Sequence, residues 1–244
     1  MLKGDTPENM KIIFVRHGEP DYIKDCLTEN GKKQAKNVAV RLKDQHIKAV
    51  FSSPMGRAKE SAFYTASELG QDVQILDFMH EIDWGDREDN LEEHGILPYD
   101  GHPWTLAYRM LSESTGYVGS SNWPEHHYFS DNKCIDYYMQ VSKSIDAFLA
   151  NYGLVRKDGL YECTEENNDT VVIFAHGGSG AVLFSHIFCL PFPFVLTSMP
   201  FGVCSVSIID FTAQHGTMVI PRLELFNDMG HIESFIIEKL HFEK

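Results

Sequence analysis

The sequence predicts an α/β fold with a mostly parallel sheet that helices cover on both faces. Short apolar runs rich in β-branched residues alternate along the chain with segments of helical periodicity, which is typical of parallel sheets. With 244 residues, of which 43% are hydrophobic and 12% aromatic, the chain can bury one sizeable core. We therefore expect a single domain over residues 1–244.

The first third of the chain contains two units in which a helix follows a strand. Each strand is a short apolar run, and each helix carries small or apolar residues at spacings that place them on one face. The predicted elements are strands at 11–15, 47–51 and 73–76, a helix capped by Thr28, and a helix that starts at Ser52-Ser53-Pro54 and stops at Gly70.

Periodicity is lost between about residues 84 and 133, where Trp, Tyr, His, Gly and Pro are frequent. This segment reads as an irregular or helical insertion, either a cap over an active site or an ordered surface excursion with no catalytic part. Regular patterns then return. We expect a helix whose inner face runs from Ile135 to Tyr152, a buried strand at 170–175 followed by an apolar helix, and strands at 203–211 and 217–226.

Charge and cysteine content limit the partners and the compartment. The formal net charge of -14 disfavours nucleic acid and anionic membranes, and we expect neither as a partner. Five widely spaced cysteines without a CxxC pair, and an N-terminus without an apolar signal core, favour a reduced, cytoplasmic protein. His126, His127 and Asp131 can be imagined as metal ligands, but adjacent histidines in a loop are usually surface residues, so we predict no metal. We also predict no cofactor.

Two histidines follow predicted strands directly. Arg16-His17-Gly18 comes after the first strand, and His176-Gly177-Gly178 comes after the strand at 170–175. Ligands of such sheets bind beyond the carboxyl ends of the strands. We therefore expect His17 and His176, far apart in the sequence, to meet in one pocket.

Five blocks of residues, in this order, resemble the histidine phosphatase superfamily, which includes cofactor-dependent phosphoglycerate mutases and many small phosphatases. The likeness covers roughly residues 10–83 and 134–212 and implies a phosphoglycerate mutase-like fold. The blocks are Arg16-His17-Gly18-Glu19, Leu27-Thr28 with Gly31 and Gln34-Ala35, Ser52-Ser53-Pro54 with Arg57-Ala58, Glu81 before Gly85, and Ala175-His176-Gly177-Gly178.

The resemblance implies a phosphohistidine mechanism. A neutral imidazole can attack phosphorus and form a phosphoramidate, and His17 is the expected nucleophile. Arg16 and Arg57 match the arginines that clamp phosphate, and His176 resembles the second histidine, whose protonation is left open. Glu81 resembles the acid that protonates the leaving oxygen; Asp83 and a simple solvated acidic loop are the alternatives.

Other residues near these motifs are expected to have supporting roles. The backbone amide of Gly177 lies at a helix start, where it can bind an anion, and Ser179 is expected to cap that helix. Glu19 is expected to be structural, either bonding its own loop or orienting an arginine. Where many relatives have Thr and a downstream Asn, this chain has Pro20-Asp21-Tyr22, so Tyr22 is the possible substitute for one phosphate contact.

The favoured function is hydrolysis of a phosphomonoester, with a small phosphorylated metabolite as substrate. The residues that follow Glu81 resemble the Gly-Asp loop of the phosphatases more than the corresponding run of the mutases. Two alternatives remain: a phosphoglycerate mutase-type phosphoryl transferase, and a protein-directed phosphatase or a protein that binds a phosphorylated partner. The sequence does not indicate the oligomeric state.

Overall fold

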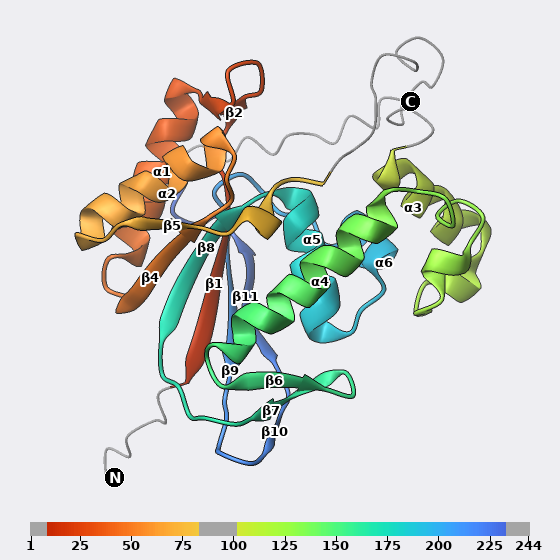
Figure 1. Ribbon diagram of the computed structural model, residues 1–244. Helices are drawn as coiled ribbons and strands as arrows, with labels where there is room; N and C mark the ends of the chain where they lie inside the picture. The colour runs from red at the N-terminus through yellow and green to blue at the C-terminus, as the bar shows by residue number, and fades with distance from the viewer. Residues whose placement is uncertain (1–8, 83–101, 233–244) are drawn as a thin grey trace.

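The computed structural model describes residues 9–82 and 102–232, and its centre is a sheet in the order β11-β9-β1-β8-β4-β5 (Figure 1). Strands β1, β8, β4 and β5 are parallel to one another, whereas β9 is antiparallel to both β1 and β11. The predicted α/β fold is confirmed. The strands are β1 (Met10–Arg16), β4 (Ile47–Ser52), β5 (Val73–Ile75), β8 (Thr170–Ala175), β9 (Val206–Phe211) and β11 (Arg222–Asp228).

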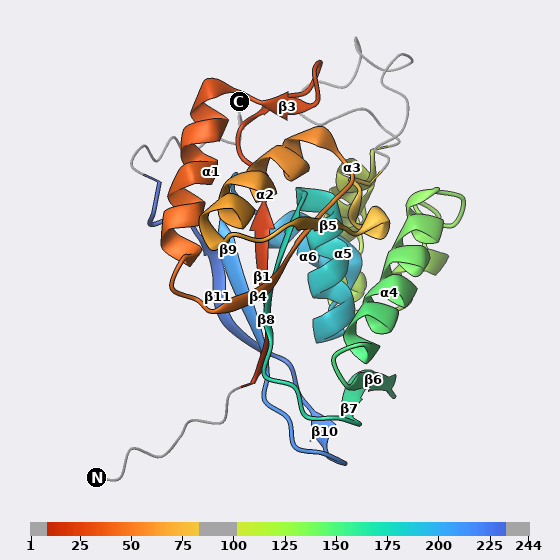
Figure 2. The same ribbon diagram turned by 60° about the vertical axis from the view of Figure 1, so that its left-hand side comes forward.

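Helices cover both faces of this sheet. Helices α1 (Glu29–Leu42) and α2 (Gly56–Leu69) lie on one face, and α4 (Cys134–Ala150) and α5 (Gly177–Phe188) lie on the other (Figure 2). Alternate side chains of β1 point to opposite faces of the sheet. Ile13 and Val15 are buried in the cluster under α1 and α2, and Ile12 and Phe14 are buried in the cluster under α4 and α5. Burial on both faces explains why the run at 12–15 is apolar throughout.

Two predicted helix boundaries are confirmed, and one is wrong. The Thr28 hydroxyl accepts a hydrogen bond from the Gly31 amide and caps α1, and Gly70 ends α2 in the left-handed conformation. Helix α2 begins at Gly56 and not at Ser52-Ser53-Pro54, because β4 continues to Ser52 and the Ser53 amide still bonds Phe174 O. The buried face of α4 includes Cys134, Tyr137 and Val141, one residue before the predicted positions in its first turns.

A small second sheet was not predicted. It contains β10 (Met218–Val219), β7 (Leu160–Cys163) and β6 (Leu154–Lys157). Asp158 and Gly159 both have positive φ in the β6–β7 turn, and an Asp-Gly pair is the signal that marks such a hairpin. The strand expected at 217–226 is divided between β10 and β11 at Pro221, which has no amide hydrogen for a ladder.

The described part of the predicted insertion, residues 102–133, contains α3 (Pro103–Glu113), η2 (Thr115–Tyr117) and η3 (Trp123–Glu125). Helix α3 contacts α6 (Phe192–Ser198), and Leu106, Met110 and Trp123 are buried in the same cluster as α4 and α5. This part of the segment is therefore packed into the domain, while residues 84–101 of the predicted insertion lie outside the described residues.

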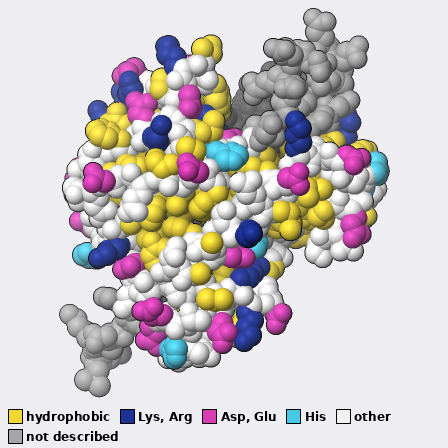
Figure 3. All heavy atoms as spheres, viewed as in Figure 1, with side chains coloured by type: hydrophobic (Ala, Val, Ile, Leu, Met, Phe, Trp, Pro, Cys, Tyr) yellow, Lys and Arg dark blue, Asp and Glu magenta, His cyan; other side chains and the backbone are white. Residues whose placement is uncertain are grey.

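No helix within the described residues has both the length and the apolar character needed to cross a membrane. On the face that Figure 3 shows, Lys and Arg side chains are scattered among Asp and Glu side chains and form no continuous basic stripe.

The register of the parallel strands determines which residues meet beyond the sheet. Arg16 and Ala175, the last residues of β1 and β8, are paired, and the His17 amide bonds Ala175 O at 2.9 Å. The Ser53 amide bonds Phe174 O at the end of β4. The loops that begin at His17, Ser53 and His176 therefore leave the sheet side by side.

Candidate active site

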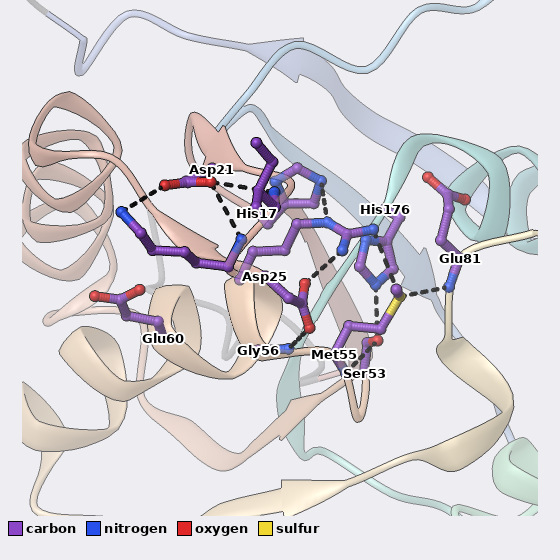
Figure 4. A network of polar contacts seen from close by, with 12 residues as sticks. His17, Asp21, Asp25, Ser53, Met55, Gly56, Glu60, Glu81 and His176 are labelled. Carbon is purple, nitrogen blue, oxygen red and sulfur yellow. Dashed lines mark hydrogen bonds and ion pairs between the residues drawn. The ribbon is translucent and has the colours of Figure 1, made fainter.

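The predicted site residues converge at the carboxyl ends of β1, β4 and β8 (Figure 4). The rings of His17 and His176 lie 5.1 Å apart, and Arg57 and Glu81 reach the same place from α2 and from the segment after η1 (Asp77–Met79). The structure therefore brings together His17 and His176, which are 159 positions apart in the chain.

His17 is buried, with 1% of its surface exposed, and its tautomer follows from its contacts. Nδ1 lies 2.7 Å from Gly18 O, and because a carbonyl can only accept, the proton is on Nδ1. Nε2 therefore carries the lone pair, and Arg57 Nε donates to it at 3.4 Å. Burial and the charges of Arg16 and Arg57 lower the pKa of His17 to about 3, so the ring is neutral at neutral pH.

His176 is the N-cap residue of α5 and is fully buried. Its Nε2 lies 2.7 Å from Ser53 Oγ, which also accepts from the Met55 amide at 3.2 Å. When the Ser53 hydroxyl donates to Nε2, the proton of His176 lies on Nδ1. Burial, followed by the nearby His17 and the two arginines, lowers the pKa of His176 to about 2. The second histidine is therefore neutral at neutral pH.

Arg16 and Arg57 are held by different partners. Arg16 Nη1 donates to Phe201 O at 2.6 Å, while its buried Nε has no hydrogen-bond partner. Arg57, whose side chain is 6% exposed, donates from Nη1 to Asp25 Oδ1 at 2.5 Å. His176 Nδ1 is likewise buried without a partner. Donors left unpaired at one place are what an anion-binding site requires.

Glu81 lies at the N-terminus of α5. Its Oε1 accepts from the amides of Gly178 at 3.0 Å, Ser179 at 3.3 Å and Ile82 at 3.0 Å. Burial raises the pKa of Glu81 above its usual value and outweighs the amide hydrogen bonds and arginine charges that lower it. A raised carboxyl pKa is the property that a general acid needs.

The glycine and serine that follow His176 have distinct positions. A Cβ built on Gly177 would lie 4.0 Å from Arg16 Nε, which places the first residue of α5 beside that arginine. The prediction that Ser179 is the N-cap of this helix is wrong. Ser179 is the third residue of α5, and His176 is the N-cap. Ser179 Oγ accepts from the His176 amide at 3.2 Å, so the two residues share the capping role.

Glu19 and Tyr22 also have definite contacts. The Glu19 carboxylate accepts from Thr28 Oγ1 at 2.7 Å and Asn30 Nδ2 at 2.8 Å, so it bonds its own loop to α1 as expected. The guanidinium of Arg57 lies over the face of the Tyr22 ring, 5.4 Å from its centroid, so the ring face contacts this arginine. Asp83 and Trp84 lie outside the described residues.

Sequence reasoning missed two residues of this network. Ser53 was interpreted only as part of a helix start, although the Ser-Ser-Pro motif marks its position next to the site. Asp25, in the turn between β2 (Pro20–Asp21) and β3 (Cys26–Leu27), carries no local sign of its contact with Arg57, which is 32 residues away.

The predicted metal candidates do not form a site. Within the described ranges 9–82 and 102–232, no three His, Cys, Asp or Glu side chains are grouped as metal ligands. The expectation that both adjacent histidines lie on the surface is wrong for His126. It is 7% exposed, its Nδ1 accepts from the Tyr128 amide, and its ring packs against Tyr117, while His127 is exposed.

Comparisons with known proteins show which family and which fold this chain resembles. Residues 12–105 match the family model described as "Histidine phosphatase superfamily (branch 1)". Phosphoserine phosphatase 1 of Hydrogenobacter thermophilus is 34% identical over 85 residues, which is 31% of this chain and 40% of that protein. The 2,3-bisphosphoglycerate-dependent phosphoglycerate mutase of Thermoplasma acidophilum is 36% identical over 107 residues, 38% of this chain and 52% of that protein. The matched regions thus span about half or less of these relatives.

Solved structures with the same fold cover nearly the whole chain. A mutant of phosphoserine phosphatase from Entamoeba histolytica, in complex with phosphoserine, aligns with a TM-score of 0.61 at 22% identity over 91% of this chain and 99% of that one. Mycobacterial glucosyl-3-phosphoglycerate phosphatase aligns with a TM-score of 0.59 at 19% identity over 89% of this chain and 98% of that one. At these identities the alignments establish the fold.

Proposed function

The chain belongs to the histidine phosphatase superfamily, and from that premise we propose that it hydrolyses phosphomonoesters through a phosphohistidine on His17. One observation carries the proposal: the unprotonated Nε2 of a buried, neutral His17 faces Arg57 Nε at 3.4 Å, with a second arginine and a second histidine beside it. A neutral imidazole with a free lone pair is the nucleophilic form, and the surrounding cations favour the phosphoryl group that it attacks.

In the first step His17 Nε2 forms a bond to phosphorus, and the bond from phosphorus to the ester oxygen breaks. Glu81 gives its proton to that leaving oxygen, so the alcohol departs neutral. In the second step Glu81, now ionised, takes a proton from water, and the water oxygen displaces His17 from phosphorus. Inorganic phosphate leaves, and both residues return to their starting states.

Four groups are proposed to hold the phosphoryl oxygens: Arg16 Nε, Arg57, the Nδ1–H of His176 and the backbone amide of Gly177. The buried Nε and Nδ1 atoms without partners support the first and third of these, and the place of Gly177 beside Arg16 supports the fourth. Because two arginines supply the positive charge that a metal ion supplies in other phosphatases, we propose that the reaction needs no metal and no cofactor.

The proposed substrate is a small phosphorylated metabolite, since relatives act on phosphoserine or phosphoglycerate compounds by their names. The second candidate function is phosphoryl transfer of the phosphoglycerate mutase type, because one relative is named as such a mutase. The third is a phosphatase that acts on proteins, or a protein that binds a phosphorylated partner. We also propose one domain with residues 84–133 as a cap, and a cytoplasmic location. The five free cysteines support that location, because thiols persist in a reducing compartment.

The test is a screen of purified protein against phosphorylated metabolites, with His17→Ala as control. Release of inorganic phosphate by the wild type alone supports hydrolysis, and isomerisation of a phosphorylated acid without phosphate release supports the mutase. Crystals grown with vanadate give an independent check. We expect the anion to contact Arg16, His17, Arg57 and His176, and an anion bound elsewhere would contradict the site.

A further inference from the structure

The hairpin of β2 and β3 is anchored to the start of α2 by side chains and backbone (Figure 4). Asp25 Oδ2 accepts from the Gly56 amide at 2.5 Å, and its Oδ1 accepts from Arg57 Nη1 at 2.5 Å. On the next turn of α2, Glu60 Oε2 accepts from the Leu27 amide at 2.6 Å. Helix α2 has no side-chain cap of its own at Met55, so Asp25 supplies an acceptor there from another segment.

The backbone fixes where the Asp25 carboxylate lies. Asp25 has φ of 49°, in the left-handed region that few residues other than glycine adopt, and its carbonyl oxygen is pressed against Gly56. A Cβ at position 56 would lie 2.0 Å from that oxygen, so only glycine permits this approach. Asp25 is thus held against Arg57 by close backbone packing as well as by its own hydrogen bonds.

A guanidinium group has two edges that can grip an oxyanion with a pair of donors, one formed by Nε and Nη2 and the other by the two terminal nitrogens. Asp25 occupies Nη1 and thereby uses the second edge. Nε points toward His17 Nε2, and Nη2 has only the weak acceptor Met55 Sδ at 3.5 Å. The edge that remains for an oxyanion is therefore the one that faces the nucleophile.

We propose that Asp25 is a positioning residue that holds Arg57 by Nη1, so that the Nε and Nη2 donors of Arg57 face the phosphoryl group at His17. The inference rests on the proposed function, because it assigns a role in the reaction proposed for this site. Asp25 itself does not touch the substrate; it acts through Arg57. Without Asp25, the guanidinium gains rotamers in which the donors no longer face His17 Nε2.

The kinetic test is a double-mutant cycle between Asp25→Ala and Arg57→Ala, with p-nitrophenyl phosphate as substrate. Because misplacement of a positioning group by about 1 Å can cost on the order of a hundredfold, we expect Asp25→Ala alone to lower kcat by about 10- to 100-fold. In the Arg57→Ala background the same change is expected to have little further effect. Equal losses in both backgrounds would show that Asp25 acts independently of Arg57 and would overturn the proposal.

Asp21→Asn is the matched control in the same hairpin. Asp21 accepts from the Ile23 and Lys24 amides and pairs with Lys24, and the amide oxygen of asparagine can still accept from these backbone groups. This variant is expected to keep wild-type kcat. A loss equal to that of Asp25→Ala would mean that any disturbance of the hairpin suffices, which would contradict a specific role of Asp25.

A spectroscopic readout separates this inference from the proposed function. The Arg57 Nε–H signal in a ¹H–¹⁵N spectrum, assigned with Arg57→Lys, is expected to shift in Asp25→Ala and to stay unchanged in Asp21→Asn. An unchanged signal in Asp25→Ala overturns the positioning role, whether or not the protein turns over substrate. Absence of turnover and of phosphohistidine in the wild type would instead reject the proposed function.

Discussion

Glu81 Oε1 lies 3.0 Å from the backbone nitrogen of Gly178, so a carboxyl from the segment after η1 occupies the first turn of the helix that follows His176. The contact fixes the carboxyl beside the two histidines. The partial positive charge of a helix N-terminus favours the ionised form of Glu81, whereas burial favours the neutral form, and burial dominates. This balance allows one carboxyl to give up a proton and then take one back.

The Glu81→Gln variant isolates the proton transfer. The carbonyl oxygen of glutamine can accept the same amide hydrogen bonds, so the variant keeps the contact with α5 and removes the acid. Nitrophenolate leaves with little protonation, whereas an alkyl alkoxide needs a proton. In pre-steady-state bursts we expect about a hundredfold greater loss on a sugar phosphate than on p-nitrophenyl phosphate. Equal losses would assign Glu81 a structural role.

The His17→Ala variant tests the nucleophile. We expect turnover to be abolished, because no other described side chain presents an unprotonated nitrogen at this position. His17 is buried, so circular dichroism must first confirm that the variant is folded. The measurement is covalent ³²P label after a rapid quench in alkali, in which phosphohistidine persists. We expect label in the wild type and none in the variant; comparable turnover in both would contradict the mechanism.

The Ser53→Ala variant tests the support of His176. Ser53 Oγ is buried 2.7 Å from His176 Nε2, and its removal leaves that nitrogen without a partner. We expect a loss of about 1–3 kcal/mol in the free energy of unfolding. We also expect a lower kcat, because the proton of His176 is no longer directed to Nδ1. Ser52→Ala is the matched control, since Ser52 is equally buried but donates to Ser53 O. Wild-type kcat in Ser53→Ala would contradict this role.

The two buried histidines predict how stability depends on pH. Folding lowers the pKa of His17 from 6.5 to about 3 and the pKa of His176 from 6.5 to about 2. At pH values between these limits, the unfolded chain therefore binds more protons than the folded chain. The stabilisation is present above pH 6.5 and is lost as the pH falls toward 3. Near pH 5 each histidine is expected to add about 1.4 kcal/mol per pH unit to the slope.

Urea unfolding at several pH values between 6 and 4.5 measures this slope. We expect His176→Asn to reduce it by about 1.4 kcal/mol per pH unit relative to the wild type. Glu81 contributes to the slope with the opposite sign, because its raised pKa stabilises the fold at low pH and this stabilisation is lost as the pH rises through the pKa of Glu81 in the folded state. This contribution is present in both proteins and cancels when the two slopes are subtracted. The same slope in both proteins would show that His176 is not held neutral.

Removal of metal is expected to have no effect. If Arg16 and Arg57 supply the charge at the phosphoryl group, activity in EDTA should equal activity without it. Arg57→Ala in excess Mg²⁺ is the control, because added metal is not expected to restore its activity. Activity that disappears in EDTA and returns only with added metal would reject the metal-independent mechanism.

The sequence by itself determined most strands of the central sheet, the helices that cover it and the place of both histidines. Residues 12–15 and 171–175 are apolar because they are buried on both faces of the sheet, and Thr28 and Gly70 act through contacts within a few residues. Local signals of this kind are visible in the chain. The Asp-Gly pair at 158–159 is another such signal, although its hairpin was not predicted.

Only the tertiary structure decided how the site is held. The contacts of Asp25 with Arg57, of Ser53 with His176 and of Glu81 with Gly178 join residues 32, 123 and 97 positions apart. None of these residues carries a local mark of its partner, because the pairing depends on the register of β1, β8 and β4 and on a backbone approach at Gly56. Burial then shifts the pKa values of His17, His176 and Glu81, and burial is a property of the folded chain.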